Sequence, residues 1–468
     1  MRKKNGLFGF ILLLWAAAFA AYAQAPDAQK AAAGFSERRI DAYVLPYVQS
    51  NNFSGGILIA KGDKILLRKG YGMANYELGV PNTPQTKFHV ASVSKSFTAA
   101  AIILLEQHGL LETTDPLSAY VPDYPEGQRI TIHHLLVHTS GIPNVNSFPD
   151  YDAKSRFPHT LEEIISWFKD KPLEFMPGER YHYSNSNYNL LAFVIEKVSG
   201  RAYGEFLRAN IFDPLGMKDT AHDGDPAAII LGRAHGYMPA GAQDLENAPP
   251  LVWSIKTGNG SIYTTVDDLY KWDRSLYGNK LLNEASRRKI FTDYGSDVGY
   301  GWFIRQGERR SVAISGRAPG FSASLERFID DDVCVVVTSN VYSSVTQSMA
   351  DDIAALTFGE TRAARVPATP VKVEPAILTS YEGRYRFGAD FVFNPNIVSE
   401  VQRKGEWLIL ISGGGGGASY LIPQSESRFI DRLYGGTVSF VKDARGKTTH
   451  LIWSFGENHY KAARIEPN

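Results

Sequence analysis

The chain has 468 residues, and its 49 basic and 49 acidic side chains cancel to a formal net charge of zero. This length is enough for two domains and for a sizeable buried core. The charges are balanced, and beyond the N-terminus the sequence has no basic run with interleaved aromatic residues. It therefore gives no sign of a basic surface that would bind nucleic acid. We therefore expect a small-molecule or peptide substrate and no nucleic acid as a partner.

The first 23 residues have the pattern of a cleaved signal peptide. Residues 2–4 are positive, an apolar stretch follows over residues 7–20, and residues 21–23 supply small side chains at alternate positions. The apolar stretch is short for a membrane span, so removal is favoured over an uncleaved anchor. No cysteine lies at the cleavage site, so lipid attachment is not expected there. We predict a periplasmic or secreted protein with no stable membrane anchor after signal removal.

Between residues 24 and 362, strand-like runs lie at both ends and helical patterns lie between them. Apolar residues recur at helical spacing in two stretches, and each stretch is followed by a glycine suited to end a helix. The expected elements are a β-hairpin over Gly55–Ala60 and Ile65–Lys69, helices over Ser94–His108 and Asn187–Ser199, and strands over Ser311–Ser315 and Val333–Ser339. This order predicts an α/β (α+β) domain whose sheet unites distant segments.

The sole cysteine, Cys334, lies in the apolar run Val333–Val337. Such a run is typical of a buried strand, in which a thiol behaves as a small hydrophobic side chain. A single cysteine cannot form an internal disulfide, so we expect the fold to depend on its core instead of on cross-links.

The composition changes near residue 363. Residues 363–376 are proline-rich and predict a stiff, extended linker. Residues 377–468 contain short alternating runs separated by turn residues, which is the pattern of a small β-barrel or sandwich. The expected strands cover Glu406–Ser412, Ser419–Pro423, Thr437–Lys442 and Thr449–Phe455. The glycine run Gly413–Gly417 is interpreted as a loop between strands, because no phosphate-binding motif follows it.

Ser92-Val93-Ser94-Lys95 opens the first predicted helix. Residues three apart on a helix share a face, so the Lys95 amine can reach the Ser92 hydroxyl and act as the base that a serine nucleophile needs. A lysine acts as a base only when burial or positive neighbours lower its pKa. Only Ser92 stands between a β segment and an apolar helix, whereas the same spacing also occurs at Ser166/Lys169, Ser286/Lys289 and Ser439/Lys442.

A second candidate motif, Tyr183-Ser184-Asn185, lies just ahead of the second predicted helix. A tyrosine phenolate beside an ammonium group can act as a base and can return the proton to a leaving group. Asn185 offers an amide that can orient a substrate or Lys95. The alternative is a structural turn in which Tyr183 packs and Asn185 or Ser186 caps the helix.

These two motifs together resemble the first two motifs of the class C β-lactamase and DD-peptidase family, which also includes esterases and D-aminopeptidases. Further segments match that family in a consistent order over roughly residues 35–360, namely Leu135–Pro143, Asn187–Gly200, Leu215–Thr220 and Pro319–Phe321. The region from about residue 377 resembles the lipocalin-like β-barrel often appended to such hydrolases. The resemblance implies a β-lactamase/transpeptidase-like fold, in which an antiparallel sheet is flanked by helices and joined by a helical subdomain, followed by the small barrel.

The resemblance also implies roles for individual residues. Ser92 would be the acylated nucleophile, Lys95 and Tyr183 would share the proton transfers, and Asn185 would contact the substrate. The family's chemistry needs no metal and no organic cofactor, so none is expected here.

The third motif departs from the family pattern. The family usually places Lys or His, then Ser or Thr, then Gly on the strand that lines the site, whereas this chain has Ile314-Ser315-Gly316-Arg317. The resemblance implies substrate contacts for Ser315 and Gly316, and an oxyanion hole formed by backbone N–H groups of Ser92 and Arg317. Ile314 cannot hold a substrate carboxylate, and Arg317 faces the other side of a regular strand. A substrate without a terminal carboxylate, such as an ester or an internal amide, is therefore favoured.

Three histidines, His133, His134 and His138, lie close together in the sequence. His134 and His138 are four apart and could chelate a metal, but they lack the His-Glu-x-x-His arrangement. We therefore expect no metal site there.

The sequence predicts an exported serine hydrolase that acts through a covalent acyl-Ser92 intermediate on an ester, amide or peptide. The alternative is a catalytically impaired penicillin-binding or peptide-binding protein that keeps the pocket without turnover.

Overall fold

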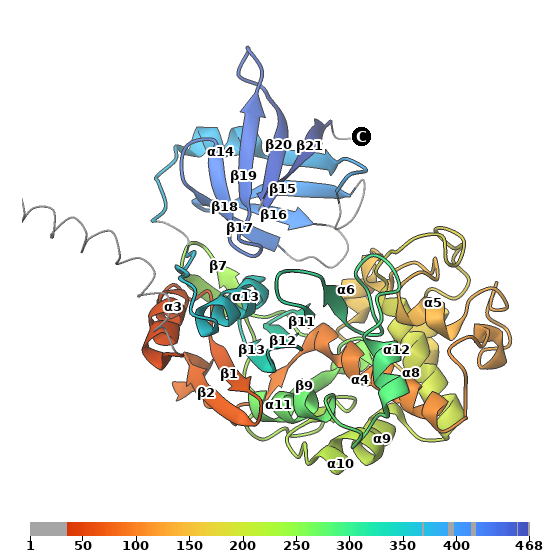
Figure 1. Cartoon of the computed structure of the whole chain (residues 1–468). Helices are drawn as coiled ribbons and strands as arrows, with labels where there is room; N and C mark the ends of the chain where they lie inside the picture. Colours follow the sequence, from red (N-terminus) through yellow and green to blue (C-terminus); the bar gives the residue numbers. More distant parts are fainter. Residues whose placement is uncertain (1–34, 367–368, 392–396, 413–417, 456, 467–468) are drawn as a thin grey trace, which may run out of the picture.

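The computed structural model describes residues 35–366, 369–391, 397–412, 418–455 and 457–466. The predicted signal peptide and the glycine run at 413–417 lie outside these residues. Figure 1 shows a larger α/β domain and, above it, a smaller barrel made by the C-terminal strands. Within the described parts of the chain, every helix is too short or too polar to cross a membrane.

A six-stranded antiparallel sheet forms the centre of the larger domain. In spatial order its strands are β10 (Phe303–Arg305), β11 (Ser311–Ala318), β12 (Phe321–Phe328), β13 (Val333–Ser339), β1 (Gly55–Lys61) and β2 (Lys64–Tyr71). The predicted hairpin is confirmed as β1 and β2, and Ile57 of β1 also pairs with Val337 of β13. The sheet therefore joins the two ends of the domain, as expected. The predicted strand near residue 311 is confirmed and extends to Ala318.

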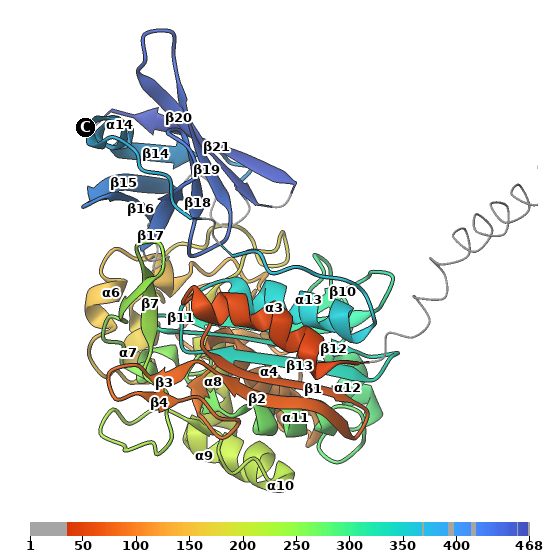
Figure 2. The same ribbon diagram turned by 90° about the vertical axis from the view of Figure 1, so that its left-hand side faces the viewer.

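The two faces of the sheet pack on different helices, because successive side chains of a strand point to opposite faces. Ile57 of β1 packs with α3 (Glu37–Gln49) and α13 (Val345–Thr357), which Figure 2 shows side by side over one face. Its neighbour Leu58 packs on the other face with α4 (Ser94–Gln107). The sequence of β1 thus supplies apolar side chains to both layers.

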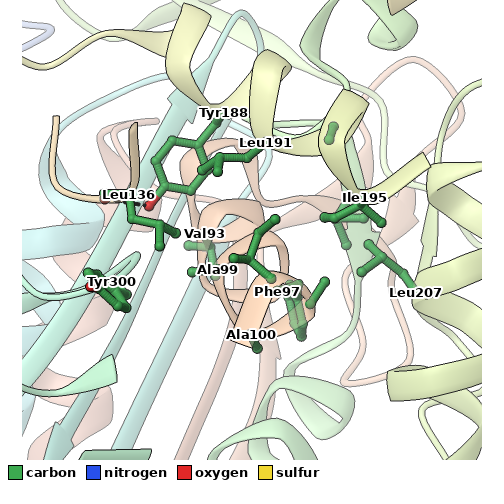
Figure 3. Packing of buried hydrophobic residues seen from close by; sticks show 14 of the residues in the cluster. Val93, Phe97, Ala99, Ala100, Leu136, Tyr188, Leu191, Ile195, Leu207 and Tyr300 are labelled. Atoms are coloured by element: carbon green, nitrogen blue, oxygen red, sulfur yellow. Dashed lines mark hydrogen bonds between the residues drawn. The ribbon is translucent and has the colours of Figure 1, made fainter. Parts of the chain in front are cut away.

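The helical region is built around α4 and α8 (Asn185–Ser199). Figure 3 shows Phe97 of α4 and Leu191 and Ile195 of α8 within one buried cluster. Both predicted helices are confirmed, but α8 begins at Asn185, so this residue is its first residue and does not lie ahead of it. Cys334 is fully buried against the same cluster, as predicted.

The remaining elements of the larger domain are short. The helices are α5 (Ile132–Leu136), α6 (Tyr151–Lys154), α7 (Leu161–Ser166), α9 (Tyr203–Leu207), α10 (Asp213–Leu215), α11 (Val266–Ser275) and α12 (Glu284–Ile290). The strands are β3 (Met73–Asn75), β4 (Val80–Pro81), β5 (Phe88–His89), β6 (Ala221–His222), β7 (Tyr237–Ala240), β8 (Asp244–Asn247) and β9 (Ile262–Thr264). β5 leads directly into the turn that precedes α4.

The C-terminal strands close into an eight-stranded antiparallel barrel, as predicted, because the last strand pairs with the first. The strands are β14 (Gly383–Phe387), β15 (Val398–Lys404), β16 (Trp407–Ser412), β17 (Ala418–Pro423), β18 (Arg428–Asp431), β19 (Thr437–Lys442), β20 (Thr448–Phe455) and β21 (Asn458–Ile465). Helix α14 (Pro375–Tyr381) precedes them and begins within the range expected for the linker. A proline suits the first turn of a helix, where its missing N–H has no partner to lose.

Candidate active site

Ser92 lies in a short 3-10 turn, Ala91–Val93, between β5 and α4. Ala91 has a φ of 45°, a left-handed conformation that a non-glycine residue adopts only under strain. Strand β11 packs against this turn at Gly316, where a Cβ atom would lie 2.2 Å from the carbonyl oxygen of Val90 and 2.5 Å from the nitrogen of Ser92. Any larger residue would separate the strand from the turn, so glycine is needed at this contact.

Two side chains converge on the Ser92 hydroxyl. The Oγ atom lies 2.8 Å from the Tyr183 hydroxyl and 3.1 Å from the Nζ atom of Lys95. Both are hydrogen-bond distances. Lys95 comes from the first turn of α4, whereas Tyr183 lies 91 positions from Ser92 in the sequence. The structure therefore brings the three predicted catalytic residues into contact.

The Lys95 amine is buried among oxygen acceptors. Its Nζ donates to the Oδ1 atom of Asn185 at 2.9 Å and to the carbonyl oxygen of Asn259 at 2.8 Å. Burial, and to a lesser extent the positive charge of Lys256, lower the pKa of Lys95 well below its ordinary value. A neutral amine has two N–H groups, which these two oxygens accept, and a lone pair that is left to face Ser92. This environment suits Lys95 as a base.

The pKa of Tyr183 shifts in the opposite direction from that of Lys95. Burial raises its pKa to about 12, and the hydrogen bond with Ser92 offsets only part of that rise. The phenol therefore keeps its proton near neutral pH. The ring of Tyr183 lies 4.5 Å from the ring of His138, which accepts a hydrogen bond from the Ser184 backbone N–H at 3.2 Å. The two pKa shifts together favour Lys95 as the base and Tyr183 as the proton donor, a division that the sequence left open.

Asn185 links the base to the helical region. Its Oδ1 atom accepts from Lys95, while its backbone N–H and its Nδ2 atom donate to the Oδ1 atom of Asn144 at 3.1 and 3.3 Å. The side chain therefore holds the Lys95 amine in one orientation. It also lines the cleft, where it can contact a substrate.

The Ser92 hydroxyl opens into a cleft of about 600 Å³. This is the size range of sites for small molecules or short peptide segments. The larger domain contributes the Ser92 turn, the Tyr183 and Asn185 side chains and Ser315–Arg317 of β11. The barrel contributes three aromatic side chains, Tyr434, Trp453 and Phe455.

Comparison with known proteins agrees with this geometry. A family model described as Beta-lactamase matches residues 40–358, a range that contains every site residue predicted from the sequence. The chain belongs to the β-lactamase family. The resemblance inferred from the sequence motifs is therefore confirmed.

Relatives of this β-lactamase-family chain include penicillin-binding proteins and a hydrolase. Penicillin-binding protein 4* of Bacillus subtilis is 30% identical over 440 residues, which cover 87% of this chain and 94% of the relative. Teichoic acid D-alanine hydrolase of Staphylococcus aureus is 28% identical over 265 residues, which cover 55% of this chain and 64% of the relative. The solved octameric penicillin-binding protein homologue from Pyrococcus abyssi superposes with a TM-score of 0.63 at 25% identity, covering 91% of this chain and 100% of the homologue.

The third motif of this β-lactamase-family chain lines two adjoining cavities, and Ser315 lines both of them. Ser315 and Arg317 line the main cleft beside Ser92. Ile314 lines a second, small cavity of about 30 Å³, which shares Ser92 and Tyr183 with the main cleft and which Lys95 also lines. Arg317 lines the main cleft only, so its side chain does not take the place of Ile314 in the small cavity beside Lys95.

The Arg317 side chain is held by its neighbours. Its guanidinium donates to the Ser344 hydroxyl at 2.7 Å and lies 4.5 Å from the ring centre of Tyr434 and 5.6 Å from that of Tyr342. Tyr434 belongs to the barrel, so the barrel contacts the strand whose backbone is expected to form the oxyanion hole.

The sequence analysis missed Lys256. This buried lysine lines the cleft, donates to the Tyr151 hydroxyl at 3.0 Å and lowers the pKa of Lys95 by its charge. A signal was present, because Lys256-Thr257-Gly258 has the Lys-Thr-Gly composition of the family's third motif. The run was not predicted as part of the site because it does not lie on the predicted strand near residue 314.

The other Ser-x-x-Lys pairs have structural contacts. The Ser166 hydroxyl donates to the carbonyl oxygen of Glu163, and Lys169 pairs with Asp123. Lys289 likewise pairs with Glu106 at 2.8 Å, and Ser439 and Lys442 lie in barrel strand β19.

The three histidines have separate environments. His133 contacts the Tyr300 hydroxyl at 2.7 Å, His134 takes part in the cap of α5, and His138 packs on Tyr183. Within the described ranges, no group of three or more His, Cys, Asp or Glu side chains is arranged to hold a metal ion.

Proposed function

We propose that this protein is an exported serine hydrolase that acts through a covalent acyl-Ser92 intermediate on an ester, amide or peptide. The observation that carries the proposal is the position of the Ser92 Oγ atom, 3.1 Å from Lys95 Nζ and 2.8 Å from the Tyr183 hydroxyl, at the floor of a cleft. A serine becomes a nucleophile when a nearby base takes its proton.

In the first step, Ser92 Oγ attacks the substrate carbonyl carbon while its proton moves to Lys95 Nζ. The resulting oxyanion accepts hydrogen bonds from the backbone N–H groups of Ser92 and Arg317. When the bond to the leaving group breaks, Tyr183 gives its proton to the departing atom and recovers one from Lys95. This leaves an acyl-Ser92 ester and a neutral Lys95 amine.

In the second step, a water molecule attacks the acyl carbon and loses a proton to the same base. The bond to Ser92 Oγ breaks, Oγ is reprotonated and the acid is released. Both steps use side chains and backbone N–H groups of the chain, and the second step also uses one water molecule. The lowered pKa of Lys95 favours the neutral amine that a base requires, and the raised pKa of Tyr183 favours the protonated phenol that a proton donor requires.

The substrate class follows from the third motif and from a relative. Ile314 removes the cation with which the family binds a terminal carboxylate, which favours an ester or an internal amide. One relative is named as a hydrolase of D-alanine on teichoic acid. D-Alanyl esters and amides are therefore the first substrates to test. The positive start, the apolar stretch and the small residues at 21–23 support export.

Replacing the nucleophile tests the proposal. Ser92→Ala is expected to lower the rate of hydrolysis of p-nitrophenyl acetate or D-alanine p-nitroanilide by about a thousandfold or more, because loss of a catalytic serine has effects of that order. Ser166→Ala is the matched control and should keep the wild-type rate, since Ser166 lies in a helix with structural contacts. Equal rates in the wild type and Ser92→Ala would refute the proposal, provided that circular dichroism shows both to be folded.

Intact-mass spectrometry separates this proposal from the alternative of a binding protein without turnover. After exposure to a penicillin or a fluorophosphonate, the wild type is expected to gain one adduct that maps to Ser92, and Ser92→Ala none. A wild-type protein without an adduct from either probe favours the binding protein.

A further inference from the structure

The barrel is fixed to the larger domain by the loop that follows β18. Arg432 at the start of this loop is buried, with 3% of its surface exposed. Its guanidinium donates to backbone carbonyl oxygens of the larger domain, those of Ser50, Asn51, Ala240, Gly241 and Asp244. Buried carbonyl groups need such donors, so the barrel is held in one place at this contact.

The next two residues of the loop contact the larger domain, and the second of them reaches β11. The carbonyl oxygen of Leu433 accepts from the backbone N–H of Ser344 at 2.9 Å, and its side chain packs with Met238 and Tyr342. Tyr434 then places its ring 4.5 Å from the guanidinium carbon of Arg317. The loop thus sets the distance between the barrel and β11.

The same loop fixes the orientation of an aromatic side chain in the cleft. Asp431 accepts hydrogen bonds from the backbone N–H groups of Leu433 and Tyr434, both at 3.1 Å, and from the indole N–H of Trp453 at 2.9 Å. The Trp453 indole is therefore held by the Asp431 carboxylate, which also binds backbone N–H groups of the loop that follows β18.

Two aromatic rings of β20 lie on the barrel side of the cleft: Trp453, which is 4% exposed and packs in the barrel core, and Phe455 beside it. Trp453 and Phe455 are stacked, with ring centres 5.8 Å apart and planes 8° apart. Both line the cleft that holds Ser92, and Phe303 of β10 lines it from the larger domain. Phe455 is 44% exposed and Phe303 is 38% exposed. Exposed aromatic side chains on both domains, along one cleft, are typical of a site that binds an apolar group.

We propose that Trp453 and Phe455 of the barrel, with Phe303, form a subsite that binds a flat apolar ring of the substrate while Ser92 attacks its carbonyl group. This inference rests on the proposed function and extends it, because it gives the C-terminal barrel a role in substrate selection. Stacked and edge-on ring contacts favour an aryl group over an alkyl group of similar size.

Three esters that carry at most one aromatic ring test the subsite: ethyl acetate, ethyl phenylacetate and benzyl acetate. They carry no ring, a ring on the acyl side and a ring on the alcohol side. Hydrolysis is followed by pH-stat titration. At least one of the two ring-bearing esters is expected to have a higher kcat/KM than ethyl acetate. Phe455→Ala is expected to lower the kcat/KM of that ester, divided by the kcat/KM of ethyl acetate, by about tenfold. Loss of about 1.4 kcal/mol of ring contact produces a change of this size.

The matched control is Phe157→Ala, which removes a phenylalanine that is 63% exposed and does not line the cleft. It should keep the wild-type ratio. The subsite would be overturned if Phe455→Ala left the kcat/KM ratio between the ring-bearing ester and ethyl acetate unchanged. It would also be overturned if the wild type preferred neither ring-bearing ester to ethyl acetate. Either result would leave the proposed hydrolysis intact.

A binding measurement separates failure of the subsite from failure of the proposed function. Saturation-transfer NMR on Ser92→Ala with benzyl acetate and ethyl phenylacetate reports ring contact without turnover. We expect saturation of the phenyl protons of at least one ester, and its loss when Phe455→Ala is added. Ring signals that are absent, or that persist unchanged in the double variant, would overturn the subsite whether or not the wild type hydrolyses any ester.

Discussion

At the scale of single residues, burial shifts the pKa values of the two groups beside Ser92 in opposite directions. It lowers the pKa of Lys95, because a charged amine loses its hydration, and it raises the pKa of Tyr183 to about 12, because a phenolate loses its own. One environment therefore prepares both a base and a proton donor. Lys256 adds to the effect on Lys95 by placing a second positive charge nearby.

This arrangement predicts how the pH dependence of hydrolysis responds to Lys256→Met. In the proposed mechanism the base is neutral Lys95, so kcat/KM is expected to rise as the pH rises through the Lys95 pKa. Removal of the Lys256 charge raises that pKa, so the rising limb of the kcat/KM profile should move to higher pH. Lys280→Met, which removes an exposed charge, is the control and should leave the limb in place. A limb that stays in place or moves to lower pH in Lys256→Met would contradict the proposed coupling.

At the scale of elements, a buried ion pair joins α11 to the central sheet. Arg327 of β12 and Asp273 of α11 are 1% and 0% exposed, and their Nε and Oδ1 atoms are 2.5 Å apart. Arg274 also contacts Asp273 at 2.6 Å. The sequence shows these residues as three ordinary charges, because their burial follows from packing across 54 positions.

Loss of one partner from this pair should destabilise the larger domain. Arg327→Ala leaves the Asp273 charge buried and less compensated, and we expect it to lower the free energy of unfolding by about 3–5 kcal/mol. Urea unfolding followed by circular dichroism measures the change. The control is Arg310→Ala, because Arg310 pairs with Asp330 at 2.7 Å while both are more than half exposed. That exposed pair should contribute about 0–1 kcal/mol, and equal losses in the two variants would contradict the role of burial.

At the scale of the whole molecule, the active-site cleft is shared between the two domains. The catalytic groups belong to the larger domain, whereas Tyr434, Trp453 and Phe455 reach the cleft from the barrel. Arg432 holds the barrel in the position that allows this. Figures 1 and 2 both show the barrel resting on one side of the larger domain, close to β7.

Arg432→Ala should therefore loosen the contact between the domains. Hydrogen bonds to a charged group contribute about 1.5–3 kcal/mol, so we expect the undocked state to become at least about tenfold more populated. Hydrogen–deuterium exchange of the β7–β8 segment should become faster by a similar factor. Arg428→Ala removes an exposed arginine of β18, the strand that precedes this loop, and serves as the control. Unchanged exchange in Arg432→Ala would show that other contacts suffice to hold the barrel.

The sequence by itself determined the features that depend on local spacing. The Ser92–Lys95 pair needs only one helical turn, the β1–β2 hairpin only a short turn, and the barrel strands only alternating side chains between turns. These predictions are confirmed with small shifts of boundary. The family motifs added Tyr183 and Asn185, which spacing alone left open to interpretation as a turn.

Only the tertiary structure decided the features that depend on contacts between distant segments. The Asn259 carbonyl group lies 164 positions from the Lys95 amine that it accepts from, and no local pattern marks it. The same holds for the ring of Phe455, and the Lys-Thr-Gly run at Lys256 does not by itself show that its charge lies near Lys95. The physical reason is that burial and proximity, which set pKa values and shape the cleft, arise from packing of the whole chain, whereas a sequence pattern records only what neighbouring residues do together.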